Sequence, residues 1–188
     1  MLKVNELNTI KQDPAPAGHL VLDIETLGIT KGAAILSIGA VCGEASFYAV
    51  ISPFEGHVED GTLKWWRSGS VDEVALLEAF KPSKPYSLEN ALRDFLAFIE
   101  INKPKYFWGN SPDFDYGHLE HWLNFYGLDI PWNYYQLRDI RTIKDYVSSE
   151  ELDKIEAKDY QKHVALDDAK AERDILAFFL FGNEVRNE

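Results

Sequence analysis

Asp23 and Glu25 are two acidic residues separated by one position, within the segment 21–26 that reads VLDIET. The apolar residues around them are typical of a buried strand, and side chains alternate along a strand, so both carboxylates point to the same face. Two like charges side by side are unfavourable unless a cation or a proton compensates them. Carboxylate oxygens suit a hard cation such as Mg²⁺ or Mn²⁺. The motif alone leaves a second interpretation open, an exposed edge strand with two solvated acids.

A second group of acids occurs in the segment 108–116, which reads WGNSPDFDY. A strand is predicted to end at Trp108, a turn that contains Asn110 follows, and an acid then opens a helix. Asp113 or Asp115 could instead cap that helix, which would explain an acid at this place without any chemistry.

His163 precedes Asp168 by five positions in the segment 163–169, which reads HVALDDA. On one continuous helix this spacing would place the two residues on different sides, because a turn takes about 3.6 residues. We therefore expect His163 in the loop before a helix and Asp168 near its first turn, where the helix dipole favours an acid. A hydrogen-bonded structural histidine, and a capping or solvated role for Asp167 or Asp168, are the alternatives.

The apolar patterning around these motifs predicts the elements that position them. Three short apolar runs joined by short turns predict an antiparallel meander. Helices and strands alternate beyond them, which is typical of an α/β fold with a mixed sheet, where sites collect at strand ends and helix starts. The predicted strands are 19–24, 33–41, 46–51, 106–108 and 134–137, and the predicted helices follow Ser87, span 115–126 and run from His163 to about Leu180.

The composition indicates a folded protein of one domain. Of its 188 residues 46% are hydrophobic, enough to bury a substantial core. We expect that domain at 18–181, between a leader of low order at 1–17 and a polar tail at 182–188. The single cysteine, Cys42, cannot form an internal disulfide, and neither a signal peptide nor an apolar run long enough to span a membrane is evident. We therefore expect a soluble, cytoplasmic protein.

The formal net charge of −12 argues against a strong passive binder of nucleic acid, because an acidic protein repels phosphate. A nucleic-acid ligand would therefore need a local compensation of charge. Bound divalent cations would provide it, since they are often the largest charges in their site.

Taken together and in this order, the three motifs resemble those of the DEDDh branch of the DEDD exonucleases, in the RNase H-like superfamily. That branch includes the proofreading subunit of the bacterial replicative polymerase, ribonuclease T and oligoribonuclease. The likeness spans about 19–181 and is greatest to small prophage and bacterial 3′→5′ exoribonuclease-like proteins, with the segment 137–142, LRDIRT, in support. The residues that match are Asp23 and Glu25 in the first motif, Asn110, Phe114 and Asp115 in the second, and His163 and Asp168 in the third.

The second motif departs from the commonest family pattern. Four residues separate Asn110 from Asp115, where the usual number is three, and this makes Asp113 a competitor for the same role. We favour Asp115 because it follows Phe114 and begins the helix with an apolar face. For the third motif, the spacing from the histidine favours Asp168 over Asp167.

The resemblance implies a five-stranded RNase H-like sheet and a metal-dependent 3′→5′ exonuclease that degrades single-stranded nucleic acid, RNA slightly before DNA, with two Mg²⁺ or Mn²⁺ ions. Asp23 would then bridge both ions, Glu25 and Asp168 would hold the ion that binds the attacking water, and Asp115 would assist the other. His163 would be the general base, a role that suits histidine because its charge changes near neutral pH.

Contacts to the substrate are expected from residues beside the motifs and from a tryptophan pair. On a helix adjacent residues point about 100° apart, so one ring of the pair can be buried while the other projects and stacks on a base. Both rings could instead pack in the core or against a partner. The expected substrate-binding residues are Thr26, Leu27, Asn110, Arg141, Trp65 and Trp66.

Aromatic residues are numerous, with nine Tyr, eleven Phe and five Trp, and since such residues are enriched at interfaces a homodimer is expected. Two other functions fit some of the same residues. One is a different metal-dependent phosphohydrolase, such as a phosphatase. The other is a non-catalytic module that binds nucleic acid or protein on the same fold.

Overall fold

The computed structural model describes residues 18–156, 158 and 160–182, so the leader predicted at 1–17 and the tail from 183 onward lie outside the described residues. Within the described part, no helix is both long enough and apolar enough to cross a membrane.

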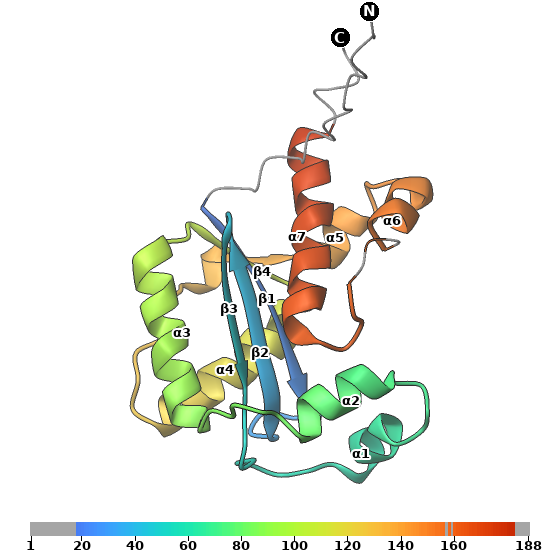
Figure 1. Cartoon of the computed structure of the whole chain (residues 1–188). Helices are drawn as coiled ribbons and strands as arrows, with labels where there is room; N and C mark the ends of the chain where they lie inside the picture. Colours follow the sequence, from blue (N-terminus) through green and yellow to red (C-terminus); the bar gives the residue numbers. More distant parts are fainter. Residues whose placement is uncertain (1–17, 157, 159, 183–188) are drawn as a thin grey trace, which may run out of the picture.

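Five strands form one mixed sheet in the order β3-β2-β1-β4-β5 (Figure 1). The first three strands pair antiparallel in sequence, and β4 then pairs parallel with both β1 and β5. This confirms the predicted meander and the mixed α/β sheet. The strands are β1 (His19–Thr26), β2 (Ile35–Cys42), β3 (Ala45–Val50), β4 (Tyr106–Gly109) and β5 (Leu137–Asp139). The helices are α1 (Asp60–Trp66), α2 (Glu73–Phe80), α3 (Leu88–Asn102), α4 (Pro112–Phe125), α5 (Ile140–Lys144), α6 (Ser149–Glu156) and α7 (Ala165–Phe181).

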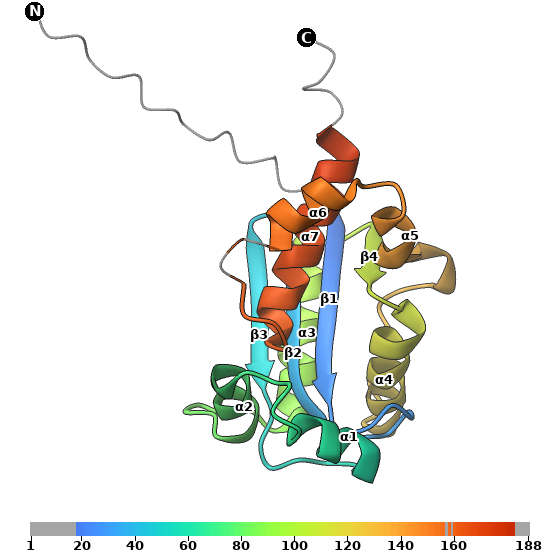
Figure 2. The ribbon, with the colours of Figure 1, turned by 90° about the vertical axis from the view of Figure 1, so that its right-hand side faces the viewer.

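Different helices cover the two faces of the sheet. Figure 1 and Figure 2 show α3 on one face of the sheet and α7 on the other, and buried residues of α4 pack in the same core cluster as those of α3. Alternate residues of β1 divide accordingly, because Leu20 and Leu22 pack in one core cluster with residues of α3 and α4, whereas Val21 packs in another with residues of α5 and α7. Asp23 and Glu25 continue the row of Val21, so alternation places both carboxylates on the α7 side.

The predicted fifth strand is wrong in its position. Tyr134–Gln136 forms a 3-10 turn, and strand β5 begins only at Leu137. The side chain of Gln136 closes this turn by accepting a hydrogen bond from the backbone N–H of Asn133 at 2.9 Å. A local side-chain contact of this kind competes with strand pairing.

Helix α4 begins at Pro112, three residues before the predicted start at Asp115. Proline is well suited to the first position of a helix, where its missing N–H would have no partner in any case. The earlier start leaves Asp115 in the first turn of the helix. The Ser87 N-cap of α3 is confirmed, since its hydroxyl accepts a hydrogen bond from the N–H of Asn90 at 3.3 Å.

Candidate active site

A glycine opposite Asp23 brings α7 against the sheet. Gly39 of β2 pairs with Asp23 of β1, and a Cβ atom added at Gly39 would lie 2.2 Å from the backbone nitrogen of Leu166. No side chain therefore fits between β2 and the first turn of α7. This close approach carries Asp168, in that same turn, towards the acids of β1.

A second glycine leaves room for the side chain of Asp115. A Cβ atom at Gly109, the last residue of β4, would lie 2.9 Å from Oδ2 of Asp115. The Asp115 side chain is 3% exposed and reaches over the end of β4. The acid of the second motif is thus delivered to the same end of the sheet as the acid pair of β1.

His163 lies immediately before α7 and faces Glu25. One ligand atom each of Glu25, His163 and Asp168 lies within 4.8 Å of the others, and the His163 Nδ1 to Glu25 Oε1 distance is 3.8 Å. His163 has a left-handed backbone with φ of 65°, and its N–H donates to Oδ2 of Asp168 at 2.8 Å. This hydrogen bond between the two residues of the third motif fixes the loop that contains His163 to the first turn of α7.

Burial of the acids raises their pKa values, and their mutual repulsion adds to the effect. The pKa of Asp23 is raised well above its usual range by loss of solvation and then by the charges of its acidic neighbours. Loss of solvation also raises the pKa of Glu25 to about 8, that of Asp115 to about 7, and that of Asp168. Oδ2 of Asp23 is buried without a hydrogen-bond partner in the described part of the chain. Such a set of oxygens needs protons or cations, and its chemistry fits a hard divalent cation.

A fifth acid belongs to this cluster and was not predicted. Glu172 of α7 is 6% exposed, and burial raises its pKa to about 8. The signal was available in the sequence, because Glu172 follows Asp168 by four positions and residues so spaced share one side of a helix.

The two competing acids are placed elsewhere. Asp113 is exposed on the surface of α4. The carboxylate of Asp167 accepts hydrogen bonds from the N–H of Gln161 at 3.2 Å and from Nζ of Lys170 at 2.9 Å. The geometry therefore favours Asp115 and Asp168 as members of the cluster.

A cavity of about 340 Å³ adjoins Glu25, between the end of β1, helix α1 and Phe114. Trp65 and Trp66 both line it, but they differ in exposure at 40% and 1%. Nε1 of Trp66 donates to the backbone oxygen of Thr26 at 2.9 Å, which ties α1 to the end of β1. One ring thus projects and the other is buried, as the helical geometry requires.

The other four residues predicted to contact substrate lie in different surroundings. Thr26 lines the cavity but donates its hydroxyl to the oxygen of Gly28 at 2.7 Å. Leu27 is 2% exposed and lies in a core cluster with Trp66. Neither side chain has an exposed face on which a base could stack, so the structure does not support stacking on Trp66. Asn110 is exposed and accepts a bond from Lys144 at 3.4 Å, while Arg141 pairs with Asp139 at 2.7 Å.

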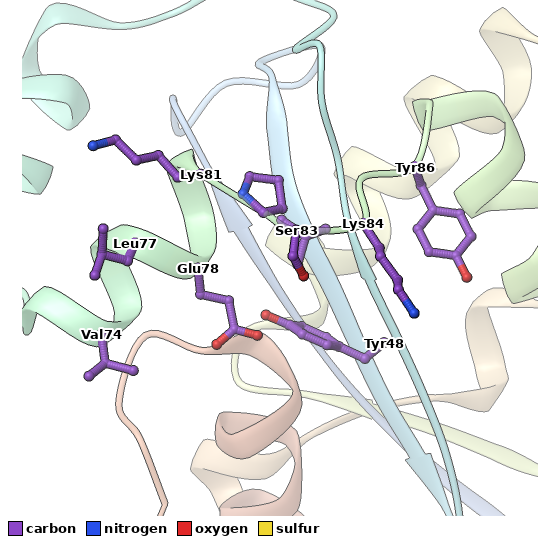
Figure 3. Close-up of a pocket in the computed structure, with 10 residues that line it drawn as sticks. Tyr48, Val74, Leu77, Glu78, Lys81, Ser83, Lys84 and Tyr86 are labelled. Carbon is purple, nitrogen blue, oxygen red and sulfur yellow. The ribbon is translucent and has the colours of Figure 1, made fainter.

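A larger hollow of about 620 Å³ lies away from the acid cluster, between β3, α2 and the segment 81–86 (Figure 3). In Figure 3 the Glu78 carboxylate and the Tyr48 hydroxyl point toward each other across it. Burial, with Glu78 adding its charge, raises the pKa of Tyr48. None of the clustered acids lines this hollow, whereas Glu25 lines the smaller cavity.

Comparison with known proteins gives one family and one fold. A family model described as a 3′-5′ exoribonuclease Rv2179c-like domain matches residues 18–180. No curated protein matches the chain. Among solved structures, the nuclease domain of 3′hExo, a DEDDh family member bound to rAMP, is 14% identical with a TM-score of 0.59, over 91% of this chain and 93% of that one.

The cell-death related nuclease 4 (CRN-4) is similar to the same degree, with 14% identity and a TM-score of 0.56 over 86% of this chain and 63% of that one. At such low identity these two likenesses show the fold alone. They confirm the predicted RNase H-like arrangement of the sheet and its helices.

Proposed function

We propose a two-cation mechanism of phosphodiester hydrolysis for this chain, which belongs to the family of 3′-5′ exoribonuclease Rv2179c-like domains and is therefore a 3′→5′ exonuclease. A convergence of acids and one histidine at the end of β1 carries the proposal. These residues are Asp23, Glu25, Asp115, Asp168 and His163.

The acids divide by position. Asp23 interacts with the charges of all the other clustered acids, so it is the residue suited to hold both cations. Glu25 and Asp168, which lie together beside His163, would hold one of them, and Asp115 would assist the other. When bound, two Mg²⁺ or Mn²⁺ ions supply neutralisation of the phosphate, activation of a water and support for the leaving oxygen. His163 takes the proton of the attacking water as general base, and its bond to Asp168 fixes the backbone that presents the ring.

The proposed substrate is the 3′ end of a single strand, with RNA slightly preferred over DNA. The cavity beside Glu25 lies at the lower end of the usual range for small-ligand sites, roughly 300–1,000 Å³, which suits one terminal nucleotide. The half-exposed ring of Trp65 offers a stacking surface that accepts any base. The net charge of −12 leaves little basic surface to hold a duplex.

Product analysis on matched single-stranded RNA and DNA, each labelled at the 5′ end, tests the proposal in the presence of Mn²⁺. We expect a ladder that shortens from the 3′ end and releases nucleoside 5′-monophosphates. Asp23→Asn and excess EDTA should each reduce the rate by on the order of 10²-fold or more.

A closed circular single strand is the control for end-directed action, since it offers no end. Its digestion would contradict the proposal, and so would full activity in EDTA. Release of inorganic phosphate without mononucleotides would indicate a phosphatase instead, and no turnover by the wild type with Mn²⁺ would indicate a binding module.

A further inference from the structure

Glu172 presents a free carboxylate oxygen in the interior of the acid cluster. The residue is 6% exposed, and its Oε2 is buried without a hydrogen-bond partner in the part of the chain that the structure describes. Oδ2 of Asp23 has the same property. A buried carboxylate oxygen without a donor is unfavourable, so two of them in one cluster indicate a shared ligand that is positively charged.

Glu172 lies beside Lys144, whose Nζ is 3.8 Å from its Oε1, and Asp115 is the acid whose charge acts on it most strongly. The acids that raise the pKa of Glu25 by their charge are Asp168 and Asp115. The charge of Glu172 acts on Asp23 and, along with that of Asp115, on the buried hydroxyl of Tyr116. The acids whose charges act on Glu172 are Asp115 first, and then Asp168 and Asp139. Glu25, His163 and Asp168 form the other group, whose ligand atoms lie within 4.8 Å of one another.

We propose that Glu172 is a fifth acidic ligand of the metal centre and binds the second cation, the one on the Asp115 side. The proposal rests on the two-cation function above. The resemblance assigns only Asp115 and the bridging Asp23 to that cation. Glu172 adds a third carboxylate there, which makes the second position comparable in charge to the first.

Lys144 forms an ion pair with Oε1 of Glu172, which leaves Oε2 able to bind a cation. Its Nζ lies 3.8 Å from Oε1 of Glu172 and 3.4 Å from Oδ1 of Asn110. The Lys144 ammonium compensates the charge of one carboxylate, but the charges of Asp23, Asp115 and Asp168 also interact with that of Glu172. The ion pair therefore orients Glu172 without neutralising the cluster.

Calorimetric titration of the full chain with Mn²⁺ tests this assignment without relying on activity. The titration is run alone and with a saturating nucleoside 5′-monophosphate, the proposed product. We expect two cations on the wild type, and on Glu172→Gln one unchanged site with the second weakened about 10-fold or more. Glu89→Gln is the matched control, because Glu89 is an exposed acid that pairs with Arg93 on α3, and it should titrate as the wild type does.

A crystal grown with Mn²⁺ gives an independent measurement. Anomalous scattering should show two peaks, one of them roughly 2–2.5 Å from a Glu172 oxygen, the range for direct coordination of hard cations. This result would support the assignment even if Glu172→Gln folded poorly.

The outcomes separate the two proposals. Two sites of unchanged affinity in Glu172→Gln, with a lowered melting temperature in EDTA, would make Glu172 a structural partner of Lys144 and overturn the inference alone. Fewer than two Mn²⁺ ions on the wild type under both conditions would overturn the two-cation function itself.

Discussion

The ring of Trp65 meets the ring of His163 edge to face, with 5.0 Å between the ring centroids and 87° between the ring planes. Trp65 also lines the cavity beside Glu25. The same indole therefore contacts the proposed general base and the space proposed for the terminal nucleotide. Helix α1 therefore places one ring beside both His163 and the cavity.

Replacing each tryptophan separately should give two different defects. Trp65→Ala should raise KM on oligonucleotides and lower turnover, while the melting temperature stays close to that of the wild type, because the ring is 40% exposed. Trp66→Ala should cost about 3–5 kcal/mol of stability, since it removes a fully buried ring and its bond to Thr26. Steady-state kinetics and thermal melts measure both. Unchanged kinetics in a folded Trp65→Ala variant would contradict the proposed role.

Gly39→Ala should disrupt the metal centre from a distance. The added Cβ would lie 2.2 Å from the backbone of Leu166, so α7 must move away and carry Asp168 with it. Overpacking of this kind typically costs about 1–3 kcal/mol. We expect a lower melting temperature and weaker Mn²⁺ binding. Gly61→Ala is the control, since nothing lies within 4 Å of its added Cβ and alanine favours a helix.

The motifs were predictable because they depend on local geometry. Alternation along β1 places Asp23 and Glu25 on one side, and the five-residue spacing separates His163 from the helix of Asp168. The structure brings these side chains together with Asp115. The predicted start of α4 is three residues too late, because a proline such as Pro112 occurs in turns as well as at the first position of a helix.

The rest of the site depends on contacts between distant parts of the chain. Helix α1 lines the cavity and is anchored at both ends. The Thr30 hydroxyl donates to its N-cap residue Glu59 at 2.6 Å, and Trp66 at its other end donates to the backbone oxygen of Thr26. No local pattern encodes such pairs. Glu172 was missed for a different reason. Its spacing from Asp168 places the two acids on one side of a helix, but an acid in mid-helix is usually solvated, and the burial of Glu172 depends on the packing of α7.

His163→Ala should lower turnover by about 10²–10⁴-fold, the usual effect of removing a general base, while the affinity for Mn²⁺ persists. The acids hold the cations in the proposed mechanism, and the histidine acts on the water. Single-turnover rates and calorimetry measure the two effects separately. A loss of Mn²⁺ affinity in this variant would make His163 a ligand, which its position within 4.8 Å of Glu25 and Asp168 also permits.

We propose that the chain forms a homodimer, and exposed aromatic residues support this. Tyr134 and Tyr135 are adjacent in the turn before β5 and are 87% and 61% exposed, and Phe125 at the end of α4 is 67% exposed. Aromatic side chains are enriched at interfaces. Light scattering at micromolar concentration should give twice the chain mass of 21.5 kDa. A monomeric mass would exclude the dimer under these conditions.

The buried acids should make the EDTA-treated protein lose stability as the pH rises. Burial raises the pKa of Glu25 from 4.5 to about 8, that of Glu172 from 4.5 to about 8, and that of Asp115 from 3.8 to about 7. Between the unfolded and folded pKa values the folded state binds more protons than the unfolded state, so the free energy of unfolding falls with increasing pH. The stability from these groups is complete below about pH 4 and is lost as the pH passes through about 7 to 8.

Thermal melts between pH 5 and 8.5, in EDTA and in Mn²⁺, measure this dependence. In EDTA the melting temperature should fall across the range. In Mn²⁺ it should fall less or rise, because the cations bind the ionised carboxylates and their affinity increases as protons leave. Glu172→Gln should flatten the decline in EDTA, since it removes one group that must ionise, whereas the exposed Glu89→Gln should not change it. Parallel curves for the wild type in EDTA and Mn²⁺ would show that the acids do not bind the cation.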